Sequence, residues 1–355
     1  FVQGLCHQCL TKLLKQLIAT PSFSREEDKT AMLIENFLQT RSIPFKRKHN
    51  NIWAYNKNWS ANKKTYLLNS HHDTVKPVKG WLRKPFDPSV EDGKLYGLGS
   101  NDAGASLVSL LATFVHFYDS ELPFNLIIAA TAEEEISGQK GIASILPELG
   151  PIDAGIVGEP TQMQMATAEK GLMVIDGLAK GRAGHAARNE GINALYIALE
   201  DINKLRNIDF ERESPLLGKT KLTVTQIEAG TQHNVVPDNC KFVIDVRTNE
   251  RYTNKEVFEI LQAEVRSELK ARSFRLNSSK IDQEHPLVQS GLKLTLKCFG
   301  SPTLSDQALM PFPTLKMGCG DSARSHTADE FIYLKEIEDG INLYIRLLEN
   351  LIKTS

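Results

Sequence analysis

The sequence of 355 residues lacks the features that mark several large protein classes. No apolar run approaches the roughly 20 residues that span a bilayer, so we expect no membrane segment. The formal net charge of −1 offers no basic surface for nucleic acid or an anionic membrane. A G-x-S-x-G elbow, a P-loop and an H-E-x-x-H helix are all missing. The sequence therefore does not carry the signatures of α/β-hydrolases, P-loop nucleotide hydrolases or zincin proteases.

Cysteine is scarce as well. Five cysteines, an odd number, are scattered through the chain, which favours a reducing compartment and most simply the cytoplasm. Cys6 and Cys9 form a C-x-x-C pair, but no second ligand pair follows at zinc-finger spacing. Leucine and isoleucine recur at helical spacing over residues 10–18, interrupted by two lysines. We therefore expect an amphipathic helix with both cysteines packed on it, and neither a zinc site nor a signal peptide.

The length suggests about two domains, and alternating elements predict the class of the first. Short apolar runs at 65–70, 124–131, 154–159 and 313–318 indicate buried strands, and 105–118 and 337–352 indicate helices. Alternation of this kind is typical of an α/β domain with a largely parallel mixed sheet flanked by helices.

Residues 169–279 follow a different pattern. Strands are expected at 171–181, 221–230 and 240–248, helices at 191–205 and 254–270, and a last strand at 273–281. This β-α-β-β-α-β order is the ferredoxin-like pattern. We therefore expect a discontinuous first domain, formed by residues 1–168 and 280–355, with an α+β domain of residues 169–279 inserted into it.

Acidic and imidazole side chains follow the predicted strands of the first domain. They are His71, His72 and Asp73 after the first strand, Glu133, Glu134 and Glu135 after the second, Glu159 after the third and His326 after the fourth. Asp102 stands at the start of a predicted helix. Ligands of parallel sheets bind beyond the carboxyl ends of the strands, so we expect these side chains at one rim. Each alone is explained by a hydrogen-bonded pair, a helix start or a turn, but together they indicate a metal centre.

The donor set also indicates which ions would bind. Clustered carboxylates repel one another unless cations hold them together. Two histidines with several carboxylates suit zinc, cobalt or manganese, and a shared carboxylate can hold two ions roughly 3.5–4 Å apart. Side chains alternate along a strand, so His71 and Asp73 point one way and His72 the other. We expect His71 to be a ligand, Asp73 to be its orienting carboxylate and His72 to be a packed or surface residue.

An ordered series of motifs then matches a known family. HHDTV, LYGLGSND, TAEEE, VGEPT, GRAGHAA, GTQHNVVPD, IDVR and SHTADEFI resemble those of the dinuclear zinc amidohydrolases. That family includes acetylornithine deacetylase, succinyl-diaminopimelate desuccinylase, aminoacylase and glutamate carboxypeptidases. The likeness covers essentially the whole chain and is greatest for the acetylornithine deacetylase branch. It implies two divalent ions per chain, zinc first and cobalt as the alternative, a catalytic domain, and a lid that forms a homodimer.

The resemblance implies a role for each matching residue. The metal ligands would be His71 and Glu159 for one ion, Glu135 and His326 for the other, and Asp102 as the bridge. Glu134 would be the general base, with Asp73 orienting the first histidine. His185 would reach into the active site of the partner subunit. The substrate-binding residues would be Lys170, Asn234 and Arg247.

The implied reaction is hydrolysis of the amide bond of a small N-acyl amino acid. Two ions lower the pKa of a shared water, Glu134 accepts its proton, and His185 helps to stabilise the oxyanion. We expect N-acetylornithine, N-succinylornithine or N-acetylcitrulline as the substrate, in arginine biosynthesis. The alternatives are a dipeptidase or carboxypeptidase, a succinyl-diaminopimelate desuccinylase, and a non-catalytic binding protein, against which the intact Glu134 argues. Cys319, in GCG, has no orienting pair that would make it a nucleophile.

Overall fold

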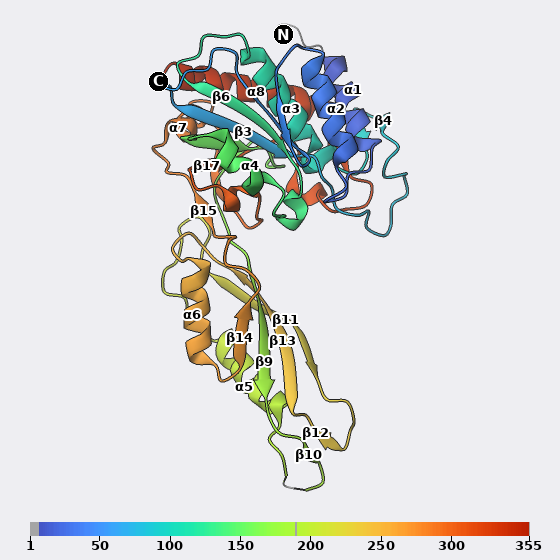
Figure 1. The fold of residues 1–355 in the computed structure, drawn as a ribbon, viewed down its shortest axis with the longest axis vertical. Coiled ribbons are helices and arrows are strands. Elements are labelled where there is room, and N and C mark those ends of the chain that lie inside the picture. The colour runs from blue at the N-terminus through green and yellow to red at the C-terminus, as the bar shows by residue number, and fades with distance from the viewer. Residues whose placement is uncertain (1–6, 189, 355) are drawn as a thin grey trace. The chain divides into compact units, whose positions relative to one another are not determined.

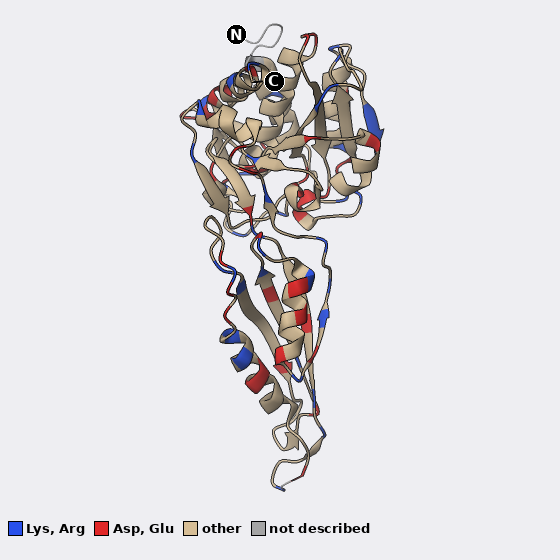
Figure 2. Cartoon of the chain, turned by 90° about the vertical axis from the view of Figure 1, so that its left-hand side faces the viewer, with Lys and Arg blue, Asp and Glu red and all other residues tan. Residues whose placement is uncertain are grey.

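A computed structural model describes residues 7–188 and 190–354, and the chain forms two compact units (Figure 1). The first unit contains Phe1–Thr167, Lys280–Phe299 and Ser305–Ser355, and the second contains Ala168–Ser279 and Gly300–Leu304. Residues 300–304 thus belong to the second unit, whereas the sequence predicted residues 280–355 to lie in the first domain. Basic and acidic residues are interspersed along the elements of both units (Figure 2).

A nine-stranded mixed sheet forms the centre of the first unit. Its order is β1-β2-β6-β3-β7-β17-β8-β15, with β16 paired to β8. The central strands β6, β3, β7 and β17 run parallel, whereas β1, β2 and β8 are joined antiparallel. The strands are β1 (Lys46–Lys48), β2 (Asn51–Tyr55), β3 (Thr65–His71), β6 (Asn125–Thr131), β7 (Ala154–Val157), β8 (Met165–Glu169), β15 (Ser279–Lys280), β16 (Cys298–Ser301) and β17 (Thr314–Lys316). The predicted class, an α/β fold with a largely parallel mixed sheet, is confirmed.

Helices cover both faces of this sheet because its strands are apolar on both sides. Leu68 of β3 packs in the core on one face, and its neighbour Leu67 packs in a separate core on the other. The first face carries α1 (His7–Ile18), α2 (Asp28–Gln39), α3 (Ala105–Phe117), α7 (Pro286–Leu292) and α8 (Leu334–Ile352). The second face carries α4 (Ile142–Leu149). A small sheet of β4 (Ser89–Glu91), β5 (Lys94–Tyr96) and β18 (Phe331–Tyr333) lies beside them in the first unit.

Helix α1 is amphipathic, as the leucine spacing predicts. Leu10, Leu14 and Ile18 are buried in the core of the first unit. Cys9 is exposed on this helix, so the expectation that it packs is wrong, and Cys6 lies outside the described residues. No helix in the described part of the chain combines the length and apolar character needed to cross a membrane.

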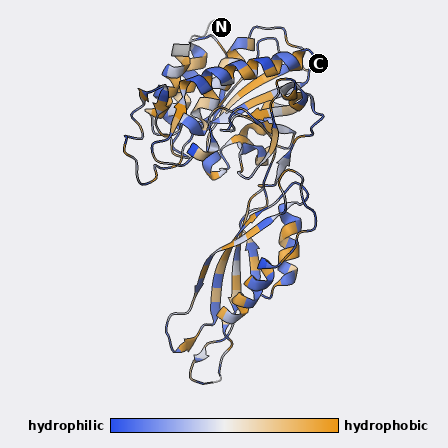
Figure 3. Cartoon of the chain, turned by 180° about the vertical axis from the view of Figure 1, so that it is seen from behind, coloured by the Kyte–Doolittle hydropathy of each residue, from blue (hydrophilic) through white to orange (hydrophobic). Residues whose placement is uncertain are grey.

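The second unit has the ferredoxin-like order, which confirms the predicted α+β insertion. Its sheet order is β11-β13-β9-β14, all antiparallel. The elements are β9 (Met173–Lys180), α5 (Ala194–Arg206), β11 (Lys221–Ala229), β13 (Asn239–Arg247), α6 (Asn254–Glu264) and β14 (Glu268–Ala271). Two short strands, β10 (Gly184–His185) and β12 (Val235–Val236), pair separately. Hydropathy alternates along the strands, whose apolar side packs against both helices (Figure 3).

One boundary in this unit differs from its prediction. The helix expected at 254–270 ends at Glu264, and the last strand is Glu268–Ala271 instead of 273–281. A buried carboxylate on α5 fixes the turn between them, because Asp201 accepts hydrogen bonds from Arg266 N, Ser267 N and Ser267 Oγ at 3.2, 2.8 and 2.6 Å. A partner so distant in sequence leaves no trace in local periodicity.

Candidate metal centre

The ends of three parallel strands place the acids and the first histidine together. His71 is the last residue of β3, and Glu159 follows two residues after β7. Glu134 and Glu135 form a 3₁₀ turn, Glu134–Ile136, just beyond β6. Glu133 before this turn has φ +55°, a left-handed conformation that changes the chain direction at the strand end.

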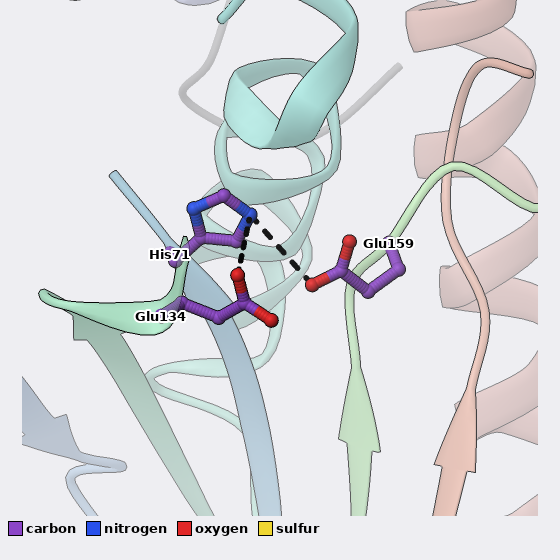
Figure 4. A group of neighbouring side chains, drawn as sticks. All are labelled: His71, Glu134 and Glu159. Carbon is purple, nitrogen blue, oxygen red and sulfur yellow. Dashed lines mark ion pairs between the residues drawn. The ribbon is translucent and has the colours of Figure 1, made fainter. Parts of the chain in front are cut away.

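His71, Glu134 and Glu159 face one another across the strand ends (Figure 4). His71 Nε2 lies 3.9 Å from Glu134 Oε2 and 3.7 Å from Glu159 Oε1. One donor atom from each residue lies within 4.8 Å of the other two, a separation that a single cation could bridge. These residues form the first half of the candidate centre.

Asp102 joins this half to a second one. Its Oδ1 lies 3.2 Å from Nε2 of His71, and its Oδ2 lies 3.7 Å from Nε2 of His326. His326 Nε2 is in turn 3.0 Å from Glu135 Oε2. The two oxygens of one carboxylate therefore face two different imidazoles, which is the arrangement that a bridging ligand requires.

Asp73 contacts His71, as predicted, and also holds the backbone of the acidic turn. His71 Nδ1 donates to the backbone carbonyl oxygen of Asp73 at 3.0 Å, while the carboxylate oxygen Oδ1 is 3.4 Å away. The carboxylate accepts hydrogen bonds from Glu134 N at 3.0 Å, Glu135 N at 3.2 Å and Ser24 Oγ at 2.7 Å. Asp73 thus fixes the acidic turn beside His71, and both its carbonyl and its carboxylate lie against the imidazole.

His72 points away from the centre, as the alternation of strand side chains predicts. It is buried, its Nδ1 accepts a hydrogen bond from Thr30 Oγ1 at 2.9 Å, and its Nε2 donates to Asn50 O at 2.8 Å. Burial lowers the pKa of His72 to about 4. It is therefore a neutral, packed side chain.

The charges at the centre are unbalanced without a cation. Burial raises the pKa of Glu159 to about 8, and burial together with neighbouring carboxylates raises the pKa of Glu134 well above its usual range. Burial lowers the pKa of His71, but the surrounding carboxylates outweigh it and raise the pKa well above 6.5. The hydrogen bond to Glu135 is the main cause that raises the pKa of His326 to about 9. The same clustered negative charge that stabilises a proton on these imidazoles would also stabilise a bound metal cation.

An unpartnered oxygen supports the same fit. Glu159 Oε1 is buried and has no hydrogen-bond partner among the described residues, although it lies on the side facing His71. Buried carboxylate oxygens without donors are costly unless a cation coordinates them. The residues present therefore fit two divalent ions, with His71, Asp102 and Glu159 around one and Asp102, Glu135 and His326 around the other.

Glu330 is a residue of the site that sequence reasoning missed. Its carboxylate is buried and accepts three backbone hydrogen bonds, from Gly99 N at 3.0 Å, Asn101 N at 2.8 Å and Asp102 N at 2.9 Å. The only signal in the sequence is its position four residues after His326, within the motif SHTADEFI. Ser24, the donor to Asp73, likewise gave no local signal.

The second unit carries the other predicted residues. His185 is exposed on β10, where its Nδ1 accepts a hydrogen bond from Ala187 N at 3.1 Å. Asn234 lies next to it, since His185 pairs with Val235 and Asn234 O accepts from Ala186 N.

The two predicted substrate cations already have partners within the second unit. Arg247 makes two hydrogen bonds to Asp245, at 2.8 and 3.1 Å, and Lys170 Nζ donates to the carbonyl oxygen of Lys219 at 2.9 Å. Burial lowers the pKa of Lys170. Substrate binding by either residue would therefore compete with a contact in the protein.

Five candidate metal-binding side chains with an adjacent carboxylate gather at the carboxyl edge of an α/β sheet, an arrangement typical of metal-dependent hydrolases. The profile of Peptidase family M20/M25/M40 matches residues 67–350, and the chain belongs to this family. The protein is accordingly a metal-dependent amidohydrolase.

Similar proteins of known sequence span the whole chain. Acetylornithine deacetylase from Proteus mirabilis (strain HI4320) is 28% identical over 379 aligned positions, which cover 96% of each protein. Succinyl-diaminopimelate desuccinylase from Delftia acidovorans (strain DSM 14801 / SPH-1) is 25% identical over 381 positions, covering 96% of this chain and 97% of that protein.

Solved structures share the fold. Aminopeptidase PepT from Bacillus cereus superimposes with a TM-score of 0.77 at 19% identity, covering 98% of this chain and 99% of that one. The YXEP protein of Bacillus subtilis, a dinuclear metal-binding peptidase of the M20 family, gives a TM-score of 0.76 at 17% identity, with the same coverage. At these identities the likeness establishes the two-unit fold and no substrate.

Proposed function

We propose that this protein hydrolyses the amide bond of a small N-acyl amino acid with two zinc ions at the centre described above. The arrangement of Asp102 carries the proposal, because its two oxygens face His71 and His326 while Glu134 stands beside them. Cobalt is the alternative metal, since the same imidazole and carboxylate donors suit both ions.

The side chains divide the work of the reaction. When bound, two divalent ions would lower the pKa of a water molecule and polarise the substrate carbonyl. Glu134, held by the bond from its backbone N–H to Asp73, accepts the proton of that water and later gives it to the leaving amine. His185 is assigned the stabilisation of the oxyanion, from the partner subunit.

N-acetylornithine is the substrate that we favour, with N-succinylornithine and N-acetylcitrulline as close variants, in arginine biosynthesis. The relative named acetylornithine deacetylase supports this choice at 28% identity over the full length. Arg247 and Lys170 are the candidate cations for the substrate carboxylate, and Asn234 is a candidate hydrogen-bonding group. A desuccinylase is the second candidate, because the relative with that name covers the chain equally well at 25% identity. A dipeptidase or carboxypeptidase with the same centre remains an alternative, because solved neighbours include peptidases.

We also propose a homodimer formed by the second unit. Strand β11 is the terminal strand of its sheet and leaves one edge for pairing with another strand. Large apolar side chains are exposed on this unit, at Tyr196 and Leu199 of α5 and Ile227 of β11. A second copy of the chain would cover both features through a two-fold interface. Cys240, Cys298 and Cys319 are free thiols, which supports the cytoplasm as the compartment.

A substrate panel with a matched active-site variant tests the activity. The purified protein should hydrolyse N-acetylornithine faster than N-succinylornithine, N-acetylcitrulline, N-succinyl-diaminopimelate and dipeptides. Chelation should abolish turnover and added zinc or cobalt should restore it. Glu134→Gln should keep the metal while lowering kcat about 10²–10⁴-fold, as expected for loss of a general base. Hydrolysis of none of these amides by the metal-loaded protein would contradict the proposal.

A further inference from the structure

We propose that Glu330 is a positioning residue that fixes Asp102 between the two cation sites. Its carboxylate accepts hydrogen bonds from the backbone N–H groups of Asn101 and Asp102 through Oε1 and of Gly99 through Oε2. Only 2% of the residue is exposed, so these bonds are protected from competing water. The carboxylate thus holds the bridging residue itself and the two ends of the turn before it.

The turn needs such an acceptor because its backbone leaves the helical path. Gly99 has φ +78°, and Asp102 has φ −117° and ψ 99°, so neither continues into α3 as a helix. Backbone N–H groups in this conformation have no carbonyl four residues earlier to receive them. A carboxylate can accept all three, whereas a glutamine would present an N–H₂ group to one of the donors.

Strand pairing delivers the carboxylate to this turn. Phe331, the next residue, pairs with Tyr96 at the end of β5, and Glu330 O accepts the N–H of Gly97. Glu330 therefore enters beside the turn in a register that the small sheet sets. The contact joins residues 228 positions apart in sequence.

The same segment carries His326, so the contact couples two ligands. Asp321 N donates to Asn101 Oδ1 at 3.0 Å, and Asn101 Nδ2 donates to Asp321 O at 3.1 Å. Residues 321–330 are thus attached to the turn at both ends, with His326 between them. Loss of the Glu330 contacts would release Asp102 relative to both histidines, and should weaken both ions together.

This inference rests on the proposed metal centre, and its test measures metal binding instead of turnover. A merely structural role is the competing explanation, and the chain offers a matched control. Asp201 is also a buried carboxylate that accepts three hydrogen bonds from a turn, but it lies in the second unit, which holds none of the five proposed ligands. Asp201→Asn and Glu330→Gln make the same chemical change, because each replaces one carboxylate oxygen, a hydrogen-bond acceptor, by an amide NH₂ group, a donor.

The experiment titrates metal-free wild-type, Glu330→Gln and Asp201→Asn proteins with zinc and with cobalt. Calorimetry gives the dissociation constants, visible absorption reports the cobalt geometry, and thermal unfolding of the metal-free proteins reports stability. We expect Glu330→Gln to bind both ions about 10–100-fold more weakly, the usual effect of losing a group that orients a ligand. We also expect an altered cobalt spectrum. Asp201→Asn should unfold at a lower temperature yet bind both ions like the wild type.

Wild-type dissociation constants and spectrum in Glu330→Gln would overturn the inference, as would equal weakening in both variants. Should Glu330→Gln not fold, Glu330→Asp replaces it in the same titration. The shorter carboxylate keeps the charge but cannot reach all three N–H groups, so weaker binding supports positioning and wild-type binding overturns it. A wild-type protein that binds neither ion would refute the metal centre itself, whereas inactivity towards the substrate panel would leave this titration unaffected.

Discussion

Asp73 Oδ1 accepts the backbone N–H of Glu134 at 3.0 Å. The residue that lies against the imidazole of the first proposed ligand thus also fixes the proposed base. A shift of Asp73 would change the distance between base and ligand without removing either side chain.

Asp73→Asn should therefore impair catalysis more than metal binding. The asparagine amide has a single oxygen as acceptor. Depending on its orientation, it therefore loses either the hydrogen bond from Glu134 N or those from Glu135 N and Ser24 Oγ. The bond from His71 Nδ1 to the backbone carbonyl survives the substitution. We expect kcat to fall about 10–100-fold with a smaller loss of metal. Steady-state kinetics and metal analysis check this, Ser24→Ala is the milder control, and an unchanged kcat would contradict it.

The low pKa of buried His72 should make the free energy of unfolding depend on pH. Its pKa is about 4 in the folded chain and 6.5 when unperturbed, so the unfolded chain binds the extra proton between these values. The contribution of neutral His72 to the free energy of unfolding is therefore complete above about pH 6.5 and is lost as the pH falls. At pH 4 the loss amounts to about 3 kcal/mol. Urea unfolding of the metal-free chain at pH 7 and pH 4.5 should show a smaller pH dependence for His72→Gln than for wild type.

Exposed His49 provides the matching control for that measurement. His49→Gln makes the same chemical change on the surface and should retain the wild-type pH dependence. If His72→Gln and wild type lose stability in parallel between the two pH values, the buried imidazole is not the source of the acid sensitivity.

Cys319 should be chemically inert in the folded protein. It is fully buried between Ser109 and Met163, and burial raises the pKa of its thiol to about 12. At pH 8 only about one thiol in 10⁴ would be ionised, and the thiolate is the reactive form. Iodoacetamide should modify Cys319 only after unfolding, as read by peptide mass spectrometry of the native and the unfolded chain. Cys319→Ala should retain kcat, and its inactivation with the metals still bound would reopen a role for this thiol.

The dimer and the role of His185 can be tested together by complementation. Glu134→Ala and His185→Ala chains should each be nearly inactive as homodimers. When the two are mixed, about half of the dimers are hybrids by random pairing, and each hybrid has one intact site. Activity should return to about a quarter of the wild-type value by the same count. Hybrids that form but stay inactive would show that His185 does not act across the interface.

The central strands were predictable from sequence because they are buried on both faces. The continuous apolar runs at β3, β6 and β7 end at polar residues, so the strand ends and the side chains beyond them could be identified together. The ferredoxin-like order was predictable for a different reason, because its strands and helices differ clearly in the period of their apolar residues.

The remaining features depend on contacts between distant residues. Helix α6 ends where Asp201 holds the following turn, and the position of Asp102 depends on Glu330. Neither acid differs in local pattern from the many solvated acids of the chain. The bond from His71 to the carbonyl of Asp73, in place of its carboxylate, depends on local backbone geometry that spacing alone does not determine.

The distance in sequence between Asp102 and Glu330 has a consequence for the order in which the site forms during synthesis of the chain. During translation the carboxylates near the ends of β3, β6 and β7 exist before residues 321–330 have been made. Until that segment pairs with β5, the turn around Asp102 lacks its acceptor and the second half of the centre lacks His326. We therefore expect the paired metal site to form only after this segment has been made, because binding of both ions depends on ligands that folding brings together. A ribosome-bound chain that stops before this segment should accordingly have no paired metal site.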